Sequence, residues 1–545
     1  MHWSILNYQF SLLEPPNTDY IKSIKDVPGF RYDPQSKTIL IYIQVYFDDY
    51  GLTRNPNTKV SAMYFTLLNL EYWLQSDRDS VYQCLVCDRS TLNQITNEGF
   101  VEYLVDDLER LSEEVIELSD GYRVKVIAHS SAADGEANNS LMAIEGYKAK
   151  FCKQCQIHHR DLKCLYSGSF NQAILPRGMS MDHAFAKINS KIFKPKFFYA
   201  FDPFHDFEGI MQKVLNPMIK IYYIEGPNFR RNLVGFANKK AILLEKYKSL
   251  QHRNGTISDI DKDGVISGTF TQIADFFLLF GYLDDLINRN ADEFKLYLLL
   301  RKIYLFVMSE AIPKSKLDAV EAAIKNFLHE YHRIYVHTKM QTMIPKMHHL
   351  DHYTEFIKEM GNMKYFHCAR YERKHQDPKH EQRSSHQFKN KAFSIAKWGA
   401  LVPTIRFQLI EDERIRKSGI DLDKPENFIY RNFIDHQREF TVLKEVKIKK
   451  VHLKPKKVFR IRSSTPQIDR PEFIQFELLV KQEERYLLIG QRIKSANYLG
   501  QRCAYRVEYE NLMTSIDVDQ LHHTECIFIP NEFLIIKDWS SEDDF

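Results

Sequence analysis

Three acidic residues, Asp48, Asp134 and Glu372, stand where carboxylates could hold metal ions. Asp48 ends a run of β-branched and aromatic residues, Asp134 follows a second strand-like run, and Glu372 falls in a helical pattern late in the chain. Cleavage of a phosphodiester by two divalent cations about 3.5–4 Å apart needs carboxylates that converge from different elements. Each acid alone is more typical of a turn or a helix cap, so the prediction depends on the fold around them.

The segments around the first two acids predict an α/β (α+β) core with a mixed sheet. The segment from Lys37 reads as a buried strand, and residues 60–70 and 80–87 read as two more. Residues 93–118 have helical spacing, and residues 122–128 form a fourth strand before a loop of small residues. Three strands, a helix and a strand, with an acid at two strand ends, is the order of an RNase H-like core.

The remaining sequence divides by periodicity. Helical spacing dominates residues 185–344, whereas alternation beyond Leu443 predicts short strands. We therefore expect an RNase H-like core interrupted by a large all-helical insertion, with a small C-terminal β-rich domain. The expected parts are an N-terminal segment (1–36), the first part of the core (37–184), the helical insertion (185–344), the closing helices with Glu372 (345–400), a connector (401–442) and the β-rich domain (443–545).

Several sequence blocks, in one order, resemble the signature blocks of the CACTA, Mirage and Chapaev transposases, and more distantly the catalytic subunit of the V(D)J recombinase. They are IYIQVYFDDYG, AADGEANNSLMAIEGYKAKFCKQC, FDPFHDFEG, and PKMHHLDHY followed by CARYERKH. Several independent motifs in the right order are much harder to obtain by chance than one. The resemblance implies a DDE nuclease whose acids fall on Asp48, Asp134 and Glu372, with Asp49 as the adjacent competitor of Asp48.

The same resemblance implies a reaction, cofactors and partners. Such an enzyme binds two Mg²⁺ or Mn²⁺ ions, cuts double-stranded DNA at transposon terminal repeats, and joins the freed 3′-hydroxyl to target DNA. Synapsis of two transposon ends implies a homodimer or a higher oligomer. A nuclear location is expected, with neither a membrane nor a small-molecule substrate.

A structural zinc site is also expected, because Cys152-Lys-Gln-Cys155 matches the family's cysteine pair and His348 and His352 match its later histidines. Two thiolates and two imidazoles complete a tetrahedral zinc, and the histidines at i and i+4 share a helix face. Such a site would couple metal binding to the geometry around Glu372. Alternative ligands are His158 or His159, close to Cys155, and His349 in place of His348.

The segment Asp202-Pro-Phe-His205 matches a further block, and two roles stay open for it. Asp202 followed by proline is a good helix N-cap, which is a structural role. Alternatively, Asp202 and His205 support the active site from behind, together with Asp206 and Glu208.

Two other motifs are interpreted as structural. Cys84-Leu-Val-Cys87 has zinc-knuckle spacing, but in a strand the two side chains would face opposite sides, so buried thiols are expected. The run from Asp259 to Ile266 resembles a calcium loop, yet Phe270 occupies the position where an EF-hand needs glutamate. We expect a solvated turn there.

Contacts to DNA phosphates are predicted for basic residues around Glu372, because the formal net charge of +4 leaves only local patches to attract DNA. They are Arg370, Arg373, Lys374, Lys379, Arg383, Lys389, Lys391 and Lys397. A second basic stretch, residues 444–462, fits either a DNA-contacting strand or an ordinary exposed one.

Composition argues against some classes of protein. The longest apolar stretch, Phe294 to Met308, is interrupted by three basic residues, and the N-terminus lacks the pattern of a secretory signal. The cysteines are therefore expected as thiols or metal ligands. No DNA-recognition region is expected before Lys37, which puts autonomous recognition of transposon ends in doubt. The alternatives are a domesticated, catalytically silent DNA-binding or chromatin protein, and a nuclease without strand transfer.

Overall fold

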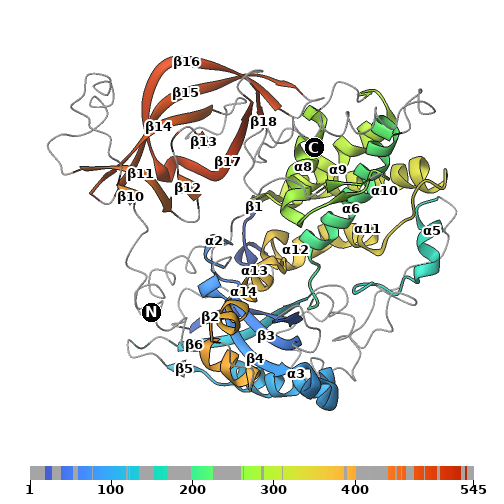
Figure 1. Cartoon of the computed structure of the whole chain (residues 1–545), viewed down its shortest axis with the longest axis vertical. Coiled ribbons are helices and arrows are strands. Elements are labelled where there is room, and N and C mark those ends of the chain that lie inside the picture. The colour runs from blue at the N-terminus through green and yellow to red at the C-terminus, as the bar shows by residue number, and fades with distance from the viewer. Residues whose placement is uncertain are drawn as a thin grey trace.

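The computed structural model is a mixed α/β protein with a five-stranded sheet, a group of packed helices and a C-terminal β-rich region (Figure 1). Among the residues described, no helix has the length and apolar character needed to cross a membrane. The described residues are 17, 19–27, 38–52, 59–70, 72–75, 78–117, 121, 123–133, 152–167, 198–224, 259–261, 263–283, 288–309, 311–385, 390–399, 416–417, 440–448, 451–453, 455, 457–461, 472–483, 485–499, 504–529 and 534–536.

The sheet that carries Asp48 has the order β4-β3-β2-β6-β5. Its strands are β2 (Thr38–Gly51), β3 (Lys59–Leu67), β4 (Tyr82–Asp88), β5 (Ile116–Glu117) and β6 (Arg123–Ala132), and α3 (Arg89–Glu113) follows β4. Strands β2 and β6 pair in parallel, while the other neighbours pair antiparallel. The predicted order of three strands, a helix and a strand is confirmed, with the short strand β5 as an addition.

Strand β2 is buried on both faces, which accounts for its nearly continuous apolar run. On one face Val45 and Phe47 pack against α3. On the other face Tyr46 and Tyr50 join a cluster with Tyr371 of α13 (Ala369–Lys374). Helix α3 therefore packs on one face of β2, and α13 packs on the other.

Asp48 lies inside β2 and not beyond its end, which corrects the sequence prediction. The strand continues to Gly51 because it stays paired with β3, where Asp48 is opposite Ala62. Its pairing with β6 ends earlier, at Tyr46 opposite Ala132. Asp48 thus stands just beyond the last residue pair of the parallel ladder.

The segment before α6 (Pro203–Ile219) lies beside the end of β6, an arrangement that the sequence did not indicate. Ser131 N donates to Phe198 O at 2.7 Å, and Ala200 N donates to Ser131 O at 2.9 Å. Tyr199 forms a parallel bridge with Ser131. Asp202 therefore starts α6 close to the sheet edge where the β2–β6 ladder ends.

The region predicted to be all-helical is mainly helical around a shared apolar core. Its helices, with those that follow, are α6, α8 (Phe270–Leu283), α9 (Asp292–Val307), α10 (Leu317–Tyr331), α11 (Pro345–His349) and α12 (Tyr353–Met360). "All-helical" is wrong, because β7 (Asp259–Ile260) pairs with β8 (Ile266–Ser267), and β9 (Ile312–Pro313) pairs with β1 (Tyr20–Ile21). These short pairings satisfy backbone groups of segments between helices.

The side chain of Asp261 closes the turn between β7 and β8. The Oδ1 atom of Asp261 accepts the backbone N–H groups of Asp263 and Val265, each at 2.9 Å. Asp261 and Asp263 are both exposed. This arrangement agrees with the predicted solvated turn.

The elements around Glu372 follow α12 closely. They are η12 (Met363–Phe366), α13, α14 (Gln376–Ser385) and a helix over residues 391–399. A helix containing Glu372 and a closing helix were both predicted.

The C-terminal region is β-rich, as predicted, and its described buried clusters contain only its own residues. Its strands are β10 (Arg416–Lys417), β11 (Phe440–Ile448), β12 (Val451–Leu453), β13 (Val458–Ile461), β14 (Glu472–Gln482), β15 (Arg485–Leu499), β16 (Ala504–Asp517), β17 (Leu521–Ile529) and β18 (Leu534–Ile536).

Gly361 ends α12 in a conformation that only glycine adopts readily, with φ 107° and ψ −166°. A Cβ atom there would lie 3.2 Å from the backbone of Ile24. Gly361→Ala should therefore lower the free energy of unfolding by about 1–3 kcal/mol. Gly99→Ala, within α3 and with only a 3.5 Å contact, should be neutral or slightly stabilising. Equal denaturation midpoints for the two variants would contradict this account of Gly361.

Candidate active site and metal centre

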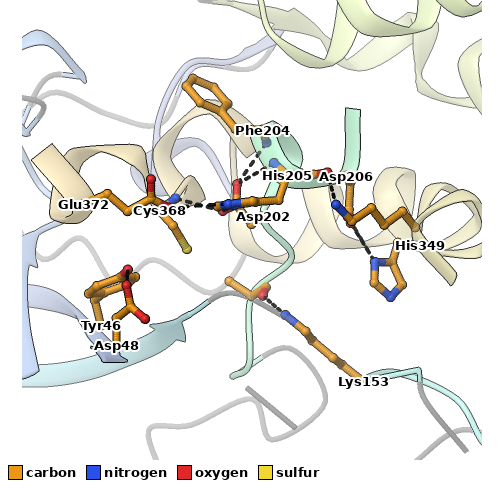
Figure 2. Close-up of polar contacts among 12 residues, drawn as sticks. Tyr46, Asp48, Lys153, Asp202, Phe204, His205, Asp206, His349, Cys368 and Glu372 are labelled. Carbon is orange, nitrogen blue, oxygen red and sulfur yellow. Dashed lines mark hydrogen bonds and ion pairs between the residues drawn. The ribbon is translucent and has the colours of Figure 1, made fainter. Parts of the chain in front are cut away.

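The structure brings Asp48 and Glu372 into one region, where Asp48 lies beside Tyr46 and Glu372 lies near both (Figure 2). The Tyr46 hydroxyl donates to Asp48 Oδ2 at 2.8 Å. Burial, and then the negative charges of Asp48, Cys368 and Glu372, hold the pKa of Tyr46 well above its ordinary value. His375, one turn after Glu372, places its Nδ1 atom 3.9 Å from Asp48 Oδ2.

Strand alternation distinguishes the adjacent acids Asp48 and Asp49. Asp48 shares the face of Tyr46 and Tyr50, which looks toward α13, whereas Asp49 points to the opposite face. The Asp49 carboxylate accepts a hydrogen bond from the Ser61 hydroxyl. Asp48 is therefore the acid that can act together with Glu372. Asp134, the third predicted acid, lies outside the described residues.

Asp202 is a buried N-cap, as one of its two predicted roles required. Its Oδ1 atom accepts the backbone N–H groups of Phe204 at 2.9 Å and His205 at 3.4 Å. Its Oδ2 atom accepts the backbone N–H of Cys368 at 3.2 Å. The carboxylate thereby connects the first turn of α6 to the start of α13.

His205 bridges Asp202 and Glu372. Its Nδ1 atom lies 2.5 Å from Asp202 Oδ2, and its Nε2 atom lies 3.5 Å from Glu372 Oε1 (Figure 2). The Glu372 side chain is 43% exposed, whereas that of Asp202 is 5% exposed. The imidazole of His205 thus contacts the solvent-accessible carboxylate of Glu372 while it is held by the buried carboxylate of Asp202.

Mutual interaction fixes the charge states of this pair. The hydrogen bond to Asp202 raises the pKa of His205 to about 9, against the opposing effect of burial. Burial opposes ionisation of Asp202, but the hydrogen bonds of His205 and Cys368 outweigh it and hold the pKa of Asp202 well below its usual range. At neutral pH the pair is an imidazolium and a carboxylate. The nearby thiol of Cys368 has a pKa raised by burial. Asp202, His205 and Cys368 lie close enough together to form a second possible metal-binding group.

The four predicted zinc ligands Cys152, Cys155, His348 and His352 converge. The Nε2 atoms of the two histidines are 3.2 Å apart. Cys155 Sγ lies 3.1 Å from His348 Nε2, and Cys152 Sγ lies 3.4 Å from His352 Nε2. A tetrahedral zinc with two sulfur and two nitrogen ligands has edges of about 3.3–3.8 Å, so this donor set fits the ion in chemistry, and its distances are close to those edges or slightly shorter.

A supporting contact orients His348. Its Nδ1 atom lies 3.2 Å from the hydroxyl oxygen of Tyr166, and that hydroxyl donates to the Asp351 carboxylate. Partners of this kind fix the ring of a metal-ligating histidine. The sequence did not single out Tyr166 because 182 residues separate it from His348.

The alternative ligands are used elsewhere. His349 Nδ1 is 2.9 Å from Asp206 Oδ1, and the Tyr353 hydroxyl donates to Asp206 Oδ2 at 2.9 Å. His158 accepts a backbone hydrogen bond from Arg160 N, and His159 is exposed. Among the described residues, none of these three histidines belongs to the converging group.

The elements of the Cys/His cluster contact the first turn of α6 directly. Lys153, inside the Cys-x-x-Cys segment, donates through Nζ to Ala200 O at 2.8 Å. Lys346, at the start of α11, donates through Nζ to His205 O at 2.7 Å. The Asp206–His349 contact adds a third connection. The two candidate centres therefore share one structural support.

The Cys84–Cys87 pair departs from its prediction in two respects. Buried thiols were predicted, but both residues are half-buried. Both side chains pack against the cluster between the sheet and α3, instead of facing opposite sides. The β3–β4 register shifts between Met63 and Tyr64, and the extra residue of such a bulge reverses the alternation. Among the described residues, neither cysteine joins a group of metal-binding side chains.

Two of the residues predicted to bind DNA are corrected. Arg370 is fully buried and donates to Gln75 and to Tyr365 O, the latter at 2.7 Å. Lys374 is also buried and donates to Arg78 O at 2.9 Å. Both lie on the inner face of the short helix α13, so neither can contact DNA. Arg373 and Lys397 are exposed, and Lys379 and Lys391 are half-buried; the side chain of Arg383, all of Lys389 and most of residues 444–462 lie outside what the structure describes.

Tyr46, Tyr371, Cys368 and His375 also border the site, and sequence reasoning missed them. Tyr46 is two residues before Asp48 and so shares its strand face, while Tyr371 precedes Glu372. That spacing was a usable signal for Tyr46 alone.

Neither a protein-family model nor a curated protein sequence matches this chain.

The Asp202–His205 pair predicts a measurable pKa. In protein free of divalent cations other than zinc, NMR of ¹³C-labelled histidine should give His205 a pKa of about 9. In Asp202→Asn, which keeps the N-cap, the pKa should fall toward the ordinary value of about 6.5. Protonated His205 stabilises the folded protein against unfolding. This contribution is fully present below about pH 6.5 and is lost as the pH rises through about 9. An ordinary His205 pKa in the wild-type protein would contradict the bridge.

Proposed function

We propose that the chain is a DDE transposase of the CACTA type, which cuts and joins DNA with Asp48, Asp134 and Glu372. The observation that carries the proposal is that Asp48 and Glu372 both lie near Tyr46, at the end of the parallel β2–β6 ladder (Figure 2). Asp134 follows Ala132, the partner of Tyr46, by two residues, just as Asp48 follows Tyr46. The strand order β4-β3-β2-β6 is the support for an RNase H-like core.

The carboxylates fit hard divalent cations. Carboxylate oxygens are ligands that Mg²⁺ and Mn²⁺ prefer, and the side chains of Asp48 and Glu372 are 20% and 43% exposed, which leaves them accessible to ions and DNA. Two bound cations would supply activation of the attacking oxygen and stabilisation of the leaving oxygen.

The other residues proposed for the site orient Glu372 and bind DNA. The imidazolium of His205 lies behind Glu372 and limits its movement. Of the basic residues predicted to contact DNA, Arg373, Lys379, Lys391 and Lys397 are described and at least partly exposed, and we assign DNA phosphates to them. The proposed substrates are transposon terminal repeats and target DNA in the nucleus, handled by a homodimer or a larger assembly.

We also propose that Cys152, Cys155, His348 and His352 bind a structural zinc ion. Their distances fit a tetrahedral site, and Lys153 and Lys346 connect its elements to α6. Zinc would therefore stabilise the position of Asp202 and His205, in addition to the fold.

The nuclease proposal predicts Mn²⁺- or Mg²⁺-dependent release of a labelled strand from terminal-repeat or branched DNA. Asp48→Asn, Asp134→Asn and Glu372→Gln should each reduce the rate on the order of 10³-fold, because metal ions contribute several kcal/mol to such a transition state. Asp49→Asn is the matched control, since its side chain lies on the other face of β2. Specific DNA binding without any cleavage would instead identify a silent DNA-binding protein.

The zinc proposal predicts that purified protein contains one zinc ion, measured by atomic emission. Cys155→Ser should lose that ion and lower the melting temperature, whereas Cys164→Ser, which changes an exposed cysteine nearby, should keep both. An unchanged zinc content in Cys155→Ser would contradict the assignment.

A further inference from the structure

Tyr46 holds the carboxylate of Asp48 in one orientation. The Tyr46 ring is completely buried, and its hydroxyl donates to Asp48 Oδ2 at 2.8 Å. The other carboxylate oxygen, Oδ1, accepts the backbone N–H of Asp49 at 2.7 Å. Two donors on different oxygens fix the plane of the carboxylate. Because each oxygen has two lone-pair sites, these bonds do not prevent it from binding a cation.

The Tyr46 ring is itself held between the sheet and α13. It stacks on Tyr371 with ring centroids 4.4 Å apart and an interplanar angle of 3°. The Tyr371 hydroxyl donates to Gln44 Oε1 at 3.0 Å, and Gln44 Nε2 donates to Ser130 Oγ at 3.2 Å. Rotation of the Tyr46 ring would disrupt this close-packed arrangement.

The stack connects the two acids. Tyr46 is two residues before Asp48 on β2, and Tyr371 is directly before Glu372 on α13. The spacing between strand and helix at this point is thus set by two rings in contact.

We propose that Tyr46 is a positioning residue for the metal site, whose hydroxyl orients Asp48 and whose ring, stacked on Tyr371, sets the distance between Asp48 and Glu372. This inference rests on the proposed function, because it assumes that Asp48 binds a divalent cation. Hydrogen-bonded partners of metal ligands typically change metal affinity or activity by about 10–100-fold when they are removed.

The test measures Mn²⁺ affinity of the zinc-loaded chain without DNA, by the electron paramagnetic resonance signal of free Mn²⁺. Tyr46→Phe removes only the hydroxyl and keeps the stacked ring. Tyr64→Phe is the matched control, since it removes a buried hydroxyl on the same sheet face whose partner is the Tyr50 hydroxyl at 3.3 Å. Asp48→Asn identifies the Mn²⁺ bound at this site. Melting temperature and zinc content verify that each variant is folded.

We expect Asp48→Asn to remove a bound Mn²⁺, Tyr46→Phe to weaken its binding about 10-fold or more, and Tyr64→Phe to leave it unchanged. Wild-type affinity in folded Tyr46→Phe, with binding lost in Asp48→Asn, would overturn the role of Tyr46 and leave the nuclease proposal standing. Equal weakening in Tyr46→Phe and Tyr64→Phe would indicate a general effect of buried hydroxyls and would also overturn it. Mn²⁺ binding that does not depend on Asp48 would overturn the metal site itself, and the inference with it.

Discussion

The buried carboxylate of Asp202 is the constraint on which the site depends. It is nearly inaccessible to solvent, yet it is charged, so it must be compensated by donors on every side. Those donors are two backbone N–H groups of α6, the His205 ring and the backbone N–H of Cys368. The need to satisfy this charge fixes the first turn of α6 against the start of α13 and so determines where Glu372 lies.

The second support is the parallel pairing of β2 with β6. The ladder ends at Tyr46 and Ala132, and the site begins just beyond that point. The segment 198–200 lies beside β6 at the same edge, which places Asp202 there too. Strand pairing, the Asp202 cap and the Tyr46–Tyr371 stack thus hold three segments distant in sequence around one region, and the Cys/His cluster holds the same α6 turn from the other side.

The sequence predicted those features that depend on local pattern. Periodicity located β2, β3, β4, α3 and β6, and the proline after Asp202 located the start of α6. The resemblance to the transposase blocks, and not a local pattern, pointed to Cys152, Cys155, His348 and His352, which the structure brings together. The four-residue spacing of the two histidines agreed with that assignment because one helical turn aligns their side chains, but it left His349 open as an alternative to His348.

Features that depend on tertiary contacts were not predictable. Arg370 reads as a DNA-binding cation, but its position on the inner face of α13 gives it Gln75 and Tyr365 as partners. The strand-like pairing of residues 198–200 carries no local signal, since Ser131 is its partner. The continuation of β2 past Asp48 follows from pairing with β3, which is a property of the sheet and not of the segment.

The central claim is that the carboxylates of Asp48, Asp134 and Glu372 share one pair of cations. Anomalous diffraction from crystals soaked in Mn²⁺ tests it most directly. The account predicts two peaks about 3.5–4 Å apart, bounded by these three carboxylates beside the Tyr46 hydroxyl. The absence of a peak there, or a peak contacted by only one of the three acids, would contradict it.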